Sequence, residues 1–302
     1  MKVAFAWVTR VFRSIGLVSG RYVLPGGADR PWAGGAVTPY ATCVLAPNPS
    51  PMTLDGTNTW VLGDAGAPEC IVVDPGPDLS AHRDAVLSAV DARRVAAVLL
   101  THGHPDHAEG AVAFAAAAAS RGPVPGVRAL DPAHRLGAEG LADGDVLAAA
   151  GVVVRVVATP GHTADSLCFL LDAAGGRGPD LLTGDTVLGR GSSVVAYPDG
   201  RLGPYLESLD RLLVVCTASD AARLLPGHGP VLDDPVGVLR AYRAHREERL
   251  AQVAGAVRAG ARTPAEVVEV VYANVDRALW PAATATVRAA LAYLAQLGGA
   301  QT

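Results

Sequence analysis

Short apolar runs, each followed by a polar turn, recur along most of the chain. Several of these runs end directly in a Gly-containing turn that carries a His or an Asp. Active sites are often built from loops at strand ends, so the pattern predicts one site assembled from distant segments. The runs have the length and the Val and Leu content of buried strands, and they lie at 43–46, 59–62, 70–73, 95–100, 152–157, 167–171, 181–183 and 224–225.

Helical patterns alternate with the predicted strands. One runs through Val86 and Val90, with Ser80 as its predicted N-cap. A second is the alanine-rich run 108–119, a strong helix former that is expected to cover the sheet. A third covers 205–213 and follows a loop rich in Gly and Ser.

Beyond residue 235 the strand pattern stops and three helices are predicted. The first is long and ends near Gly260. The second opens at Thr263 with a capping box, and the third opens at Trp280. This change predicts an N-terminal extension at 1–36, a large domain at 37–238 and a helical domain at 239–302.

Composition narrows the class of protein. With 302 residues, 50% of them hydrophobic, the chain can bury a large core, and no apolar run is long enough to span a membrane. The apolar start at 1–17 is broken by two arginines, which favours a surface extension or an overlong start over a secretory signal. Four scattered cysteines without Cys-x-x-Cys spacing predict reduced, buried thiols in a cytoplasmic protein: Cys43, Cys70, Cys168 and Cys216.

The net charge of −4 conceals an asymmetry. From Arg240 onward eight arginines face five acids, so this part carries +3 and the preceding part −7. Acidic residues at 247 and 248 interrupt an arginine series, which favours a solvated helix face over a surface that follows a phosphate backbone. The series is spaced by three and comprises Arg240, Arg243, Arg246 and Arg249.

The segment Thr101–Gly110 concentrates the chemistry. Three histidines and an aspartate fall within six residues, directly after the apolar run 95–100. Neutral imidazoles and carboxylates are ligands of Zn²⁺ and similar cations. Gly103 and Pro105 keep the segment out of a regular helix or strand, so alternate side chains can point at different metals. The segment is therefore predicted to be a metal site.

This motif, with the turns around His162, Asp185 and His228, resembles the metallo-β-lactamase-fold hydrolase superfamily. The resemblance implies an α+β fold, a four-layer αββα sandwich over roughly 37–238. The helical tail resembles the winged-helix-like C-terminal domain of the beta-lactamase-like protein 2 group. Little sequence remains for a β wing, so a three-helix cap is expected.

The resemblance also implies roles for individual residues. One metal would be bound by His102, His104 and His162, and a second by Asp106, His107 and His228. Asp185 would bridge both metals, and Asp74 would orient the ligand loop. Asp106, Asp185 and Asp74 are the residues expected to be catalytic, and Ser192 and Ser193 of the Gly/Ser loop are expected to contact substrate. The other three histidines are interpreted as surface residues: His82, His134 and His245.

Two divalent ions a few ångströms apart would lower the pKa of a bridging water and provide hydroxide at neutral pH. The sequence is therefore interpreted as a binuclear hydrolase with two Zn²⁺ ions. Mn²⁺ or Fe are alternatives because the ligands are nitrogen and oxygen only. Ser166 lies near His162 but lacks the Gly-x-Ser-x-Gly elbow of a serine hydrolase.

Three functions stay open at this point. The first is hydrolysis of an ester or thioester in a small-molecule acyl substrate. The second, implied by the resemblance, is cleavage of single-stranded RNA, and the third is a non-catalytic metal-binding scaffold. Asp185 stands where zinc β-lactamases carry a cysteine, which argues against β-lactam hydrolysis. It lies only 43 positions before His228, too few for the inserted domain of RNA-processing exonucleases. The sequence leaves the substrate, the native metal and the oligomeric state open.

Overall fold

The computed structural model describes residues 31–173 and 178–299. The first thirty residues of the predicted extension, including the apolar start at 1–17, lie outside the described part.

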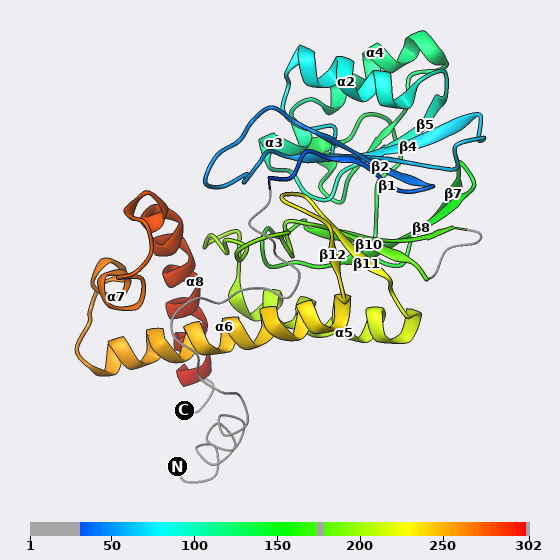
Figure 1. Ribbon diagram of the computed structural model, residues 1–302. Coiled ribbons are helices and arrows are strands. Elements are labelled where there is room, and N and C mark those ends of the chain that lie inside the picture. Colours follow the sequence, from blue (N-terminus) through cyan, green and yellow to red (C-terminus); the bar gives the residue numbers. More distant parts are fainter. Residues whose placement is uncertain (1–30, 174–177, 300–302) are drawn as a thin grey trace.

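Two six-stranded sheets pack face to face and form the inner layers of a sandwich (Figure 1). The first sheet has the order β1-β2-β3-β4-β5-β6, and the second has the order β12-β11-β10-β9-β8-β7. The strands of the first sheet are β1 (Gly35–Thr38), β2 (Ala41–Leu45), β3 (Asn58–Leu62), β4 (Glu69–Val73), β5 (Arg94–Leu99) and β6 (Val127–Arg128). Those of the second are β7 (Val146–Ala149), β8 (Val152–Ala158), β9 (Leu167–Ala173), β10 (Asp180–Gly184), β11 (Arg223–Pro226) and β12 (Leu232–Asp233).

Helices cover the outer face of each sheet, which confirms the predicted α+β, four-layer αββα arrangement (Figure 1). The first sheet is covered by α2 (Ser80–Val90) and α4 (Ala111–Ala118), with the single turn α3 (Pro105–Ala108) at its edge. The second sheet is covered by α5 (Leu202–Ser219) and α6 (Pro235–Arg258). The chain ends in α7 (Pro264–Val271) and α8 (Trp280–Gly299).

The central strands read as continuous apolar runs because both of their faces are buried. In β4, Ile71 and Val73 point into the core between the sheets, whereas Cys70 and Val72 pack toward α2 and α4. Successive side chains of a strand point to opposite faces, so two separate cores are filled by one run of four residues.

Strand direction places the ligand-bearing loops at one edge of the sandwich. β4 pairs parallel with β5, and β10 pairs parallel with β11. β8 runs in the same direction as β10, because both pair antiparallel with β9. The two sheets are joined there by backbone hydrogen bonds, from Leu167 N to Thr101 O (2.7 Å) and from Asn58 N to Gly227 O (2.8 Å).

The C-terminal helices form a cap. Its first helix, α6, also belongs to the outer layer of the sandwich (Figure 1). α6 starts at Pro235, so the boundary predicted at 238/239 falls within one continuous helix. The capping box predicted at Thr263 is present at the start of α7. Among residues 31–173 and 178–299, no strand follows β12, as the three-helix expectation required.

Several local predictions were wrong. Ser80 is the first residue of α2 rather than its N-cap, and Leu79 occupies the cap position without a side-chain hydrogen bond. The alanine-rich helix is divided, because α3 ends at Ala108 and α4 begins three residues later. His82 is not a surface residue: it lies on the buried face of α2 and is 1% exposed. His134 and His245 are only partly exposed.

All four cysteines are buried and unpaired, as predicted. Within the described residues, no helix has both the length and the apolar character needed to cross a membrane.

Candidate metal centre

Seven histidine and aspartate side chains meet at the edge where the strands end, and all seven were predicted as ligands. The turn after β5 contributes four of them, because α3 begins at Pro105 and places Asp106 and His107 one turn beyond His102 and His104. The other three follow β8, β10 and β11: His162, Asp185 and His228.

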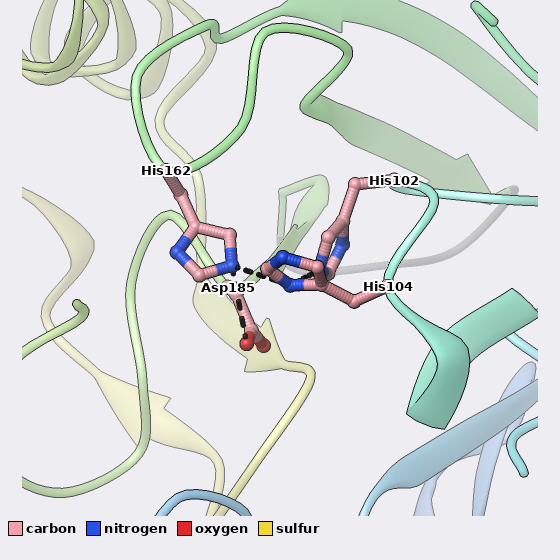
Figure 2. Close-up of side chains that lie close together, drawn as sticks. All are labelled: His102, His104, His162 and Asp185. Atoms are coloured by element: carbon pink, nitrogen blue, oxygen red, sulfur yellow. Dashed lines mark hydrogen bonds and ion pairs between the residues drawn. The ribbon is translucent and has the colours of Figure 1, made fainter. Parts of the chain in front are cut away.

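The first group joins three imidazoles and a carboxylate (Figure 2). His104 Nδ1 lies 3.0 Å from His102 Nε2 and 3.1 Å from His162 Nε2. Burial lowers the pKa of both His102 and His162, so neutral rings with free lone pairs are favoured here.

The second group contains Asp106, His107 and His228. The Nε2 atoms of the two histidines are 3.2 Å apart. Asp106 Oδ2 lies 3.2 Å from His228 Nε2 and 3.6 Å from His107 Nε2. Three donor atoms therefore face one small volume.

Asp185 lies between the two groups. Its Oδ1 is 3.4 Å from His107 Nε2, and its Oδ2 is 3.4 Å from His228 Nε2 and 3.6 Å from His162 Nε2. Oδ1 is buried and has no hydrogen-bond partner among the described residues. The carboxylate of Asp185 therefore faces imidazole nitrogens of both groups.

Backbone and side-chain acceptors fix the histidine tautomers. His162 Nδ1 is 2.7 Å from Val194 O, and His228 Nδ1 is 3.1 Å from Gly56 O. A carbonyl oxygen can only accept, so each Nδ1 carries the proton and each Nε2 presents its lone pair. The hydroxyl of Thr101 donates to Asp74 and therefore accepts from His102 Nδ1 at 3.0 Å, with the same result.

Asp74 supports this arrangement from behind. Its Oδ1 accepts from Thr101 N (2.8 Å), and its Oδ2 accepts from Thr101 Oγ1 (2.7 Å) and His107 Nδ1 (2.9 Å). The residue has a φ of 50°, and Thr59 Oγ1 donates to its carbonyl oxygen. Asp tolerates this left-handed conformation better than most residues. Its contacts are those of a residue that orients His107.

The electrostatics favour positive charge between the groups. Burial alone would lower the pKa of His107 and His228, but Asp185, with Asp74 beside His107 and Asp106 beside His228, outweighs it. The pKa of His107 is raised well above its usual range and that of His228 to about 9. Despite burial, the histidines hold the pKa of Asp106 at about 2 and that of Asp185 well below its ordinary value.

The donor set fits divalent cations. Ligands about 2.0–2.1 Å from a tetrahedral Zn²⁺ ion lie about 3.4 Å from one another. The nitrogen–nitrogen separations of 3.0–3.2 Å and the nitrogen–oxygen separations of 3.2–3.6 Å lie close to that value. Lone pairs pointed at one another at this distance repel, and a cation between them relieves the repulsion.

Comparison with known proteins agrees with this geometry. Residues 52–228 match the Metallo-beta-lactamase superfamily, which is more than half of the chain. The chain belongs to the metallo-beta-lactamase superfamily. Members of this superfamily are generally hydrolases. Residues 263–301 match the beta-lactamase associated winged helix domain, so the metallo-beta-lactamase domain is followed by a second recognised unit.

Three relatives of this chain differ in how much of their own length the chain matches. A beta-lactamase-like protein 2 homolog of Drosophila melanogaster is 33% identical over 84% of this chain and 87% of its own. The lactamase-like protein nscB of Aspergillus fumigatus is 35% identical, but the match spans 68% of this chain and only 58% of the relative. An atrochrysone carboxyl ACP thioesterase of Aspergillus chevalieri is 31% identical over 79% of this chain and 75% of its own.

Solved structures show the same fold. A beta-lactamase domain protein from Burkholderia ambifaria superposes with a TM-score of 0.72 at 23% identity, covering 91% of this chain and 92% of that one. A metallo-beta-lactamase family protein from Thermus thermophilus gives a TM-score of 0.66 at 26% identity, covering 87% of this chain and 95% of that one.

A pocket of about 210 Å³ opens beside His104 of the candidate metal centre. His104 and Thr163 are among the residues that line it. His134 lines it as well and packs against the backbone of Gly103, where a Cβ atom would lie 2.2 Å from His134 Nε2. Three carboxylates also line the pocket: Asp131, Asp165 and Asp199. Sequence reasoning missed these residues because they follow different strands and form no motif.

The two serines predicted to contact substrate lie in different environments. Ser193 is buried, and its hydroxyl donates to the carbonyl oxygen of Asp185 and lies 3.3 Å from His162 Nδ1. Ser192 is exposed. Ser193 therefore contacts His162 and Asp185 through atoms that do not face the candidate metal centre. Another contact that the sequence did not indicate is the hydroxyl of Thr57, which donates to Asp106 Oδ2 at 3.3 Å.

Proposed function

We propose that this protein is a hydrolase that binds two divalent cations and cleaves an ester or thioester bond. The metal proposed for both sites is Zn²⁺. The observation that carries the proposal is the convergence of both ligand groups on Asp185 at the side of an open pocket. When bound, such cations supply a water of lowered pKa and polarise the oxygen of the bond to be cleaved.

The protein's own residues would hold this centre in the arrangement proposed from the sequence. His102, His104 and His162 would bind one cation. The other would be held by Asp106, His107 and His228, and Asp185 would bind both. Asp74 keeps a proton on His107 Nδ1, so that Nε2 stays available. Thr57 limits the rotation of Asp106 through its hydroxyl.

The charge of the pocket supports an acyl substrate over RNA. Asp131, Asp165 and Asp199 line the pocket. A polyanionic backbone would meet like charge at that point, whereas a neutral thioester or ester would not. The thioesterase name of the Aspergillus chevalieri relative, of which the match covers 75%, agrees with this substrate class.

The arginine series supports the same choice, although not for the predicted reason. Arg243 forms ion pairs with Asp210 (2.9 Å) and Glu247 (2.7 Å). Arg246 is buried, and Arg249 donates to Val271 O at 2.9 Å. The series is therefore neither a free phosphate-binding surface nor a simple solvated face, because most of its members hold α6 to its neighbours.

A hydrolysis panel tests the proposal. The zinc-loaded protein would be offered an acyl thioester, an aryl ester, a lactone, a phosphodiester and a short single-stranded RNA. We expect turnover of the thioester or ester, lost on chelation and restored by added Zn²⁺. Asp185→Ala is the matched inactive control. Metal-dependent cleavage of RNA without any acyl hydrolysis would overturn the substrate class and make the ribonuclease function the better one.

A further inference from the structure

Segment 188–195, the Gly/Ser loop after β10, is held from outside by the C-terminal helices. Tyr242 of α6 accepts from Leu188 N at 2.8 Å and has its hydroxyl 3.0 Å from the carbonyl oxygens of Leu188 and Gly191. Thr286 of α8 accepts from Val195 N at 3.4 Å. Both ends of the segment are thus attached to the C-terminal cap.

Arg246 holds the middle of the same segment. It lies one helical turn after Tyr242, on the same face of α6, and its guanidinium donates to Ser193 O. Its guanidinium carbon lies 4.9 Å from the ring centroid of Tyr205, whose own hydroxyl donates to Thr186 O. The side chain crosses from the cap into the metallo-beta-lactamase domain.

The burial of Arg246 is not explained by stability. Its residue exposure is 4%, no carboxylate of the described residues forms an ion pair with it, and its Nε has no hydrogen-bond partner among them. A guanidinium removed from water without a carboxylate is destabilising relative to an apolar side chain of similar volume. The contacts of the guanidinium with Ser193 O and with the ring of Tyr205 are therefore the features that favour an arginine here.

Segment 188–195 in turn touches the ligand residues. Val194 O accepts the Nδ1 proton of His162 at 2.7 Å, and the Ser193 hydroxyl lies 3.3 Å from the same atom. The Ser193 hydroxyl also donates to the carbonyl oxygen of Asp185. One displaced segment would therefore turn the imidazole of His162 and move the backbone of Asp185 together.

We infer that Arg246 is a positioning residue for the metal centre, which fixes His162 through Ser193 and Val194 and so makes the C-terminal cap part of the active-site framework. The inference rests on the metal centre proposed above. It assigns the cap a role in ligand geometry in addition to any role in substrate binding.

Zinc affinity tests the inference without any substrate. Metal-free protein would be titrated with Zn²⁺ in competition with a chromophoric chelator, for the unmodified chain and for Arg246→Met. We expect one of the two equivalents to bind about 10–100-fold more weakly in Arg246→Met, the loss usual when the support of a ligand is removed. Arg246→Lys keeps a donor for Ser193 O and should therefore retain part of the zinc affinity that Arg246→Met loses.

Arg243→Met is the matched control. It lies on the same helix and removes ion pairs between α6 and its surroundings, but it does not touch segment 188–195. Both equivalents should bind within about twofold of the unmodified protein. Should Arg246→Met not fold, Tyr242→Phe removes the hydroxyl that holds Leu188 and Gly191 and should weaken the same equivalent.

The outcomes separate the two proposals. Two zinc ions bound with unchanged affinity in both Arg246→Met and Tyr242→Phe, or equal losses in Arg243→Met, would overturn the positioning role alone. No zinc bound by the unmodified protein would overturn the metal centre, and this inference with it.

Discussion

Asp185 and Asp74 differ in what they contact, and this predicts different losses. Asp185 faces both ligand groups, so Asp185→Ala should remove one ligand from each cation and abolish turnover. Asp74→Asn keeps the volume and tolerates the φ of 50°, but it removes the charge that holds the His107 proton. We expect metal to be retained and activity to fall by about 10–100-fold.

Metal content by elemental analysis, measured with turnover on the same samples, checks this pair. Complete loss of activity in both variants, with full metal content in both, would contradict the roles assigned to the two carboxylates.

His82 predicts a pH dependence of stability. Burial lowers its pKa to about 4, and its Nε2 lies 2.8 Å from Thr59 Oγ1. Because the folded pKa lies below the unfolded value of about 6.5, the unfolded chain binds the proton first. Stability is therefore full above pH 6.5 and is lost as the pH falls toward 4, by up to about 3 kcal/mol.

Urea unfolding at pH 7 and pH 4.5, for the unmodified protein and for His82→Gln, isolates this effect from that of the other histidines. The variant should lose less stability between the two pH values. Identical losses would show that His82 does not titrate in this window.

Two helix starts provide a comparison at the scale of the element. Thr263 accepts from Glu266 N at 3.2 Å, and Glu266 accepts from Thr263 N at 3.1 Å, so Thr263→Ala removes half of a capping box. The expected loss is about 1 kcal/mol of unfolding free energy. Ser80→Ala at the start of α2 should change it by less than about 0.5 kcal/mol, because Ser80 makes no cap hydrogen bond.

Thermal unfolding of the two single variants measures the difference. Equal shifts of the midpoint would mean that the capping box of α7 contributes nothing to the cooperative unit that melts.

The elements show how far sequence reasoning reaches. The ligand turns could be predicted because each follows an apolar run long enough to be a buried strand, and because His and Asp side chains have few other reasons to cluster. The short strands β1, β6, β7 and β12 were missed, since two to four residues carry too little periodicity. The burial of His82 and Arg246 was also missed, because periodicity identifies a buried face but not the element that packs on it.

At the scale of the whole molecule, the charge distribution predicts weak RNA binding. The described pocket is lined by carboxylates, and Arg243 and Arg249 of the arginine series are already engaged by protein groups, so they are poorly placed to bind phosphates. Binding of single-stranded RNA should therefore be weak at physiological salt, and Arg240→Gln with Arg243→Gln should hardly change it. If the arginines contact phosphates, the logarithm of the binding constant should fall with the logarithm of the salt concentration, with a slope of about −0.7 per contact. The double variant should then reduce the magnitude of this slope by about one to two units. Fluorescence anisotropy of a labelled RNA, which measures its affinity at salt concentrations from about 50 to about 200 mM, distinguishes the two outcomes.

The continuity of α6 has a consequence for engineering. Domains are usually joined by exposed, flexible linkers, and modules joined in that way can be exchanged between relatives. Here the connection is one helix from Pro235 to Arg258 that belongs to both parts (Figure 1). A chimaera that joins this sandwich to another relative's cap should therefore be cut before α6 and should carry that relative's version of 188–195 as well. A cut at residue 258 would preserve the helix. It would, however, separate Arg246 and Tyr242 from Thr286 of α8, which binds the same segment 188–195.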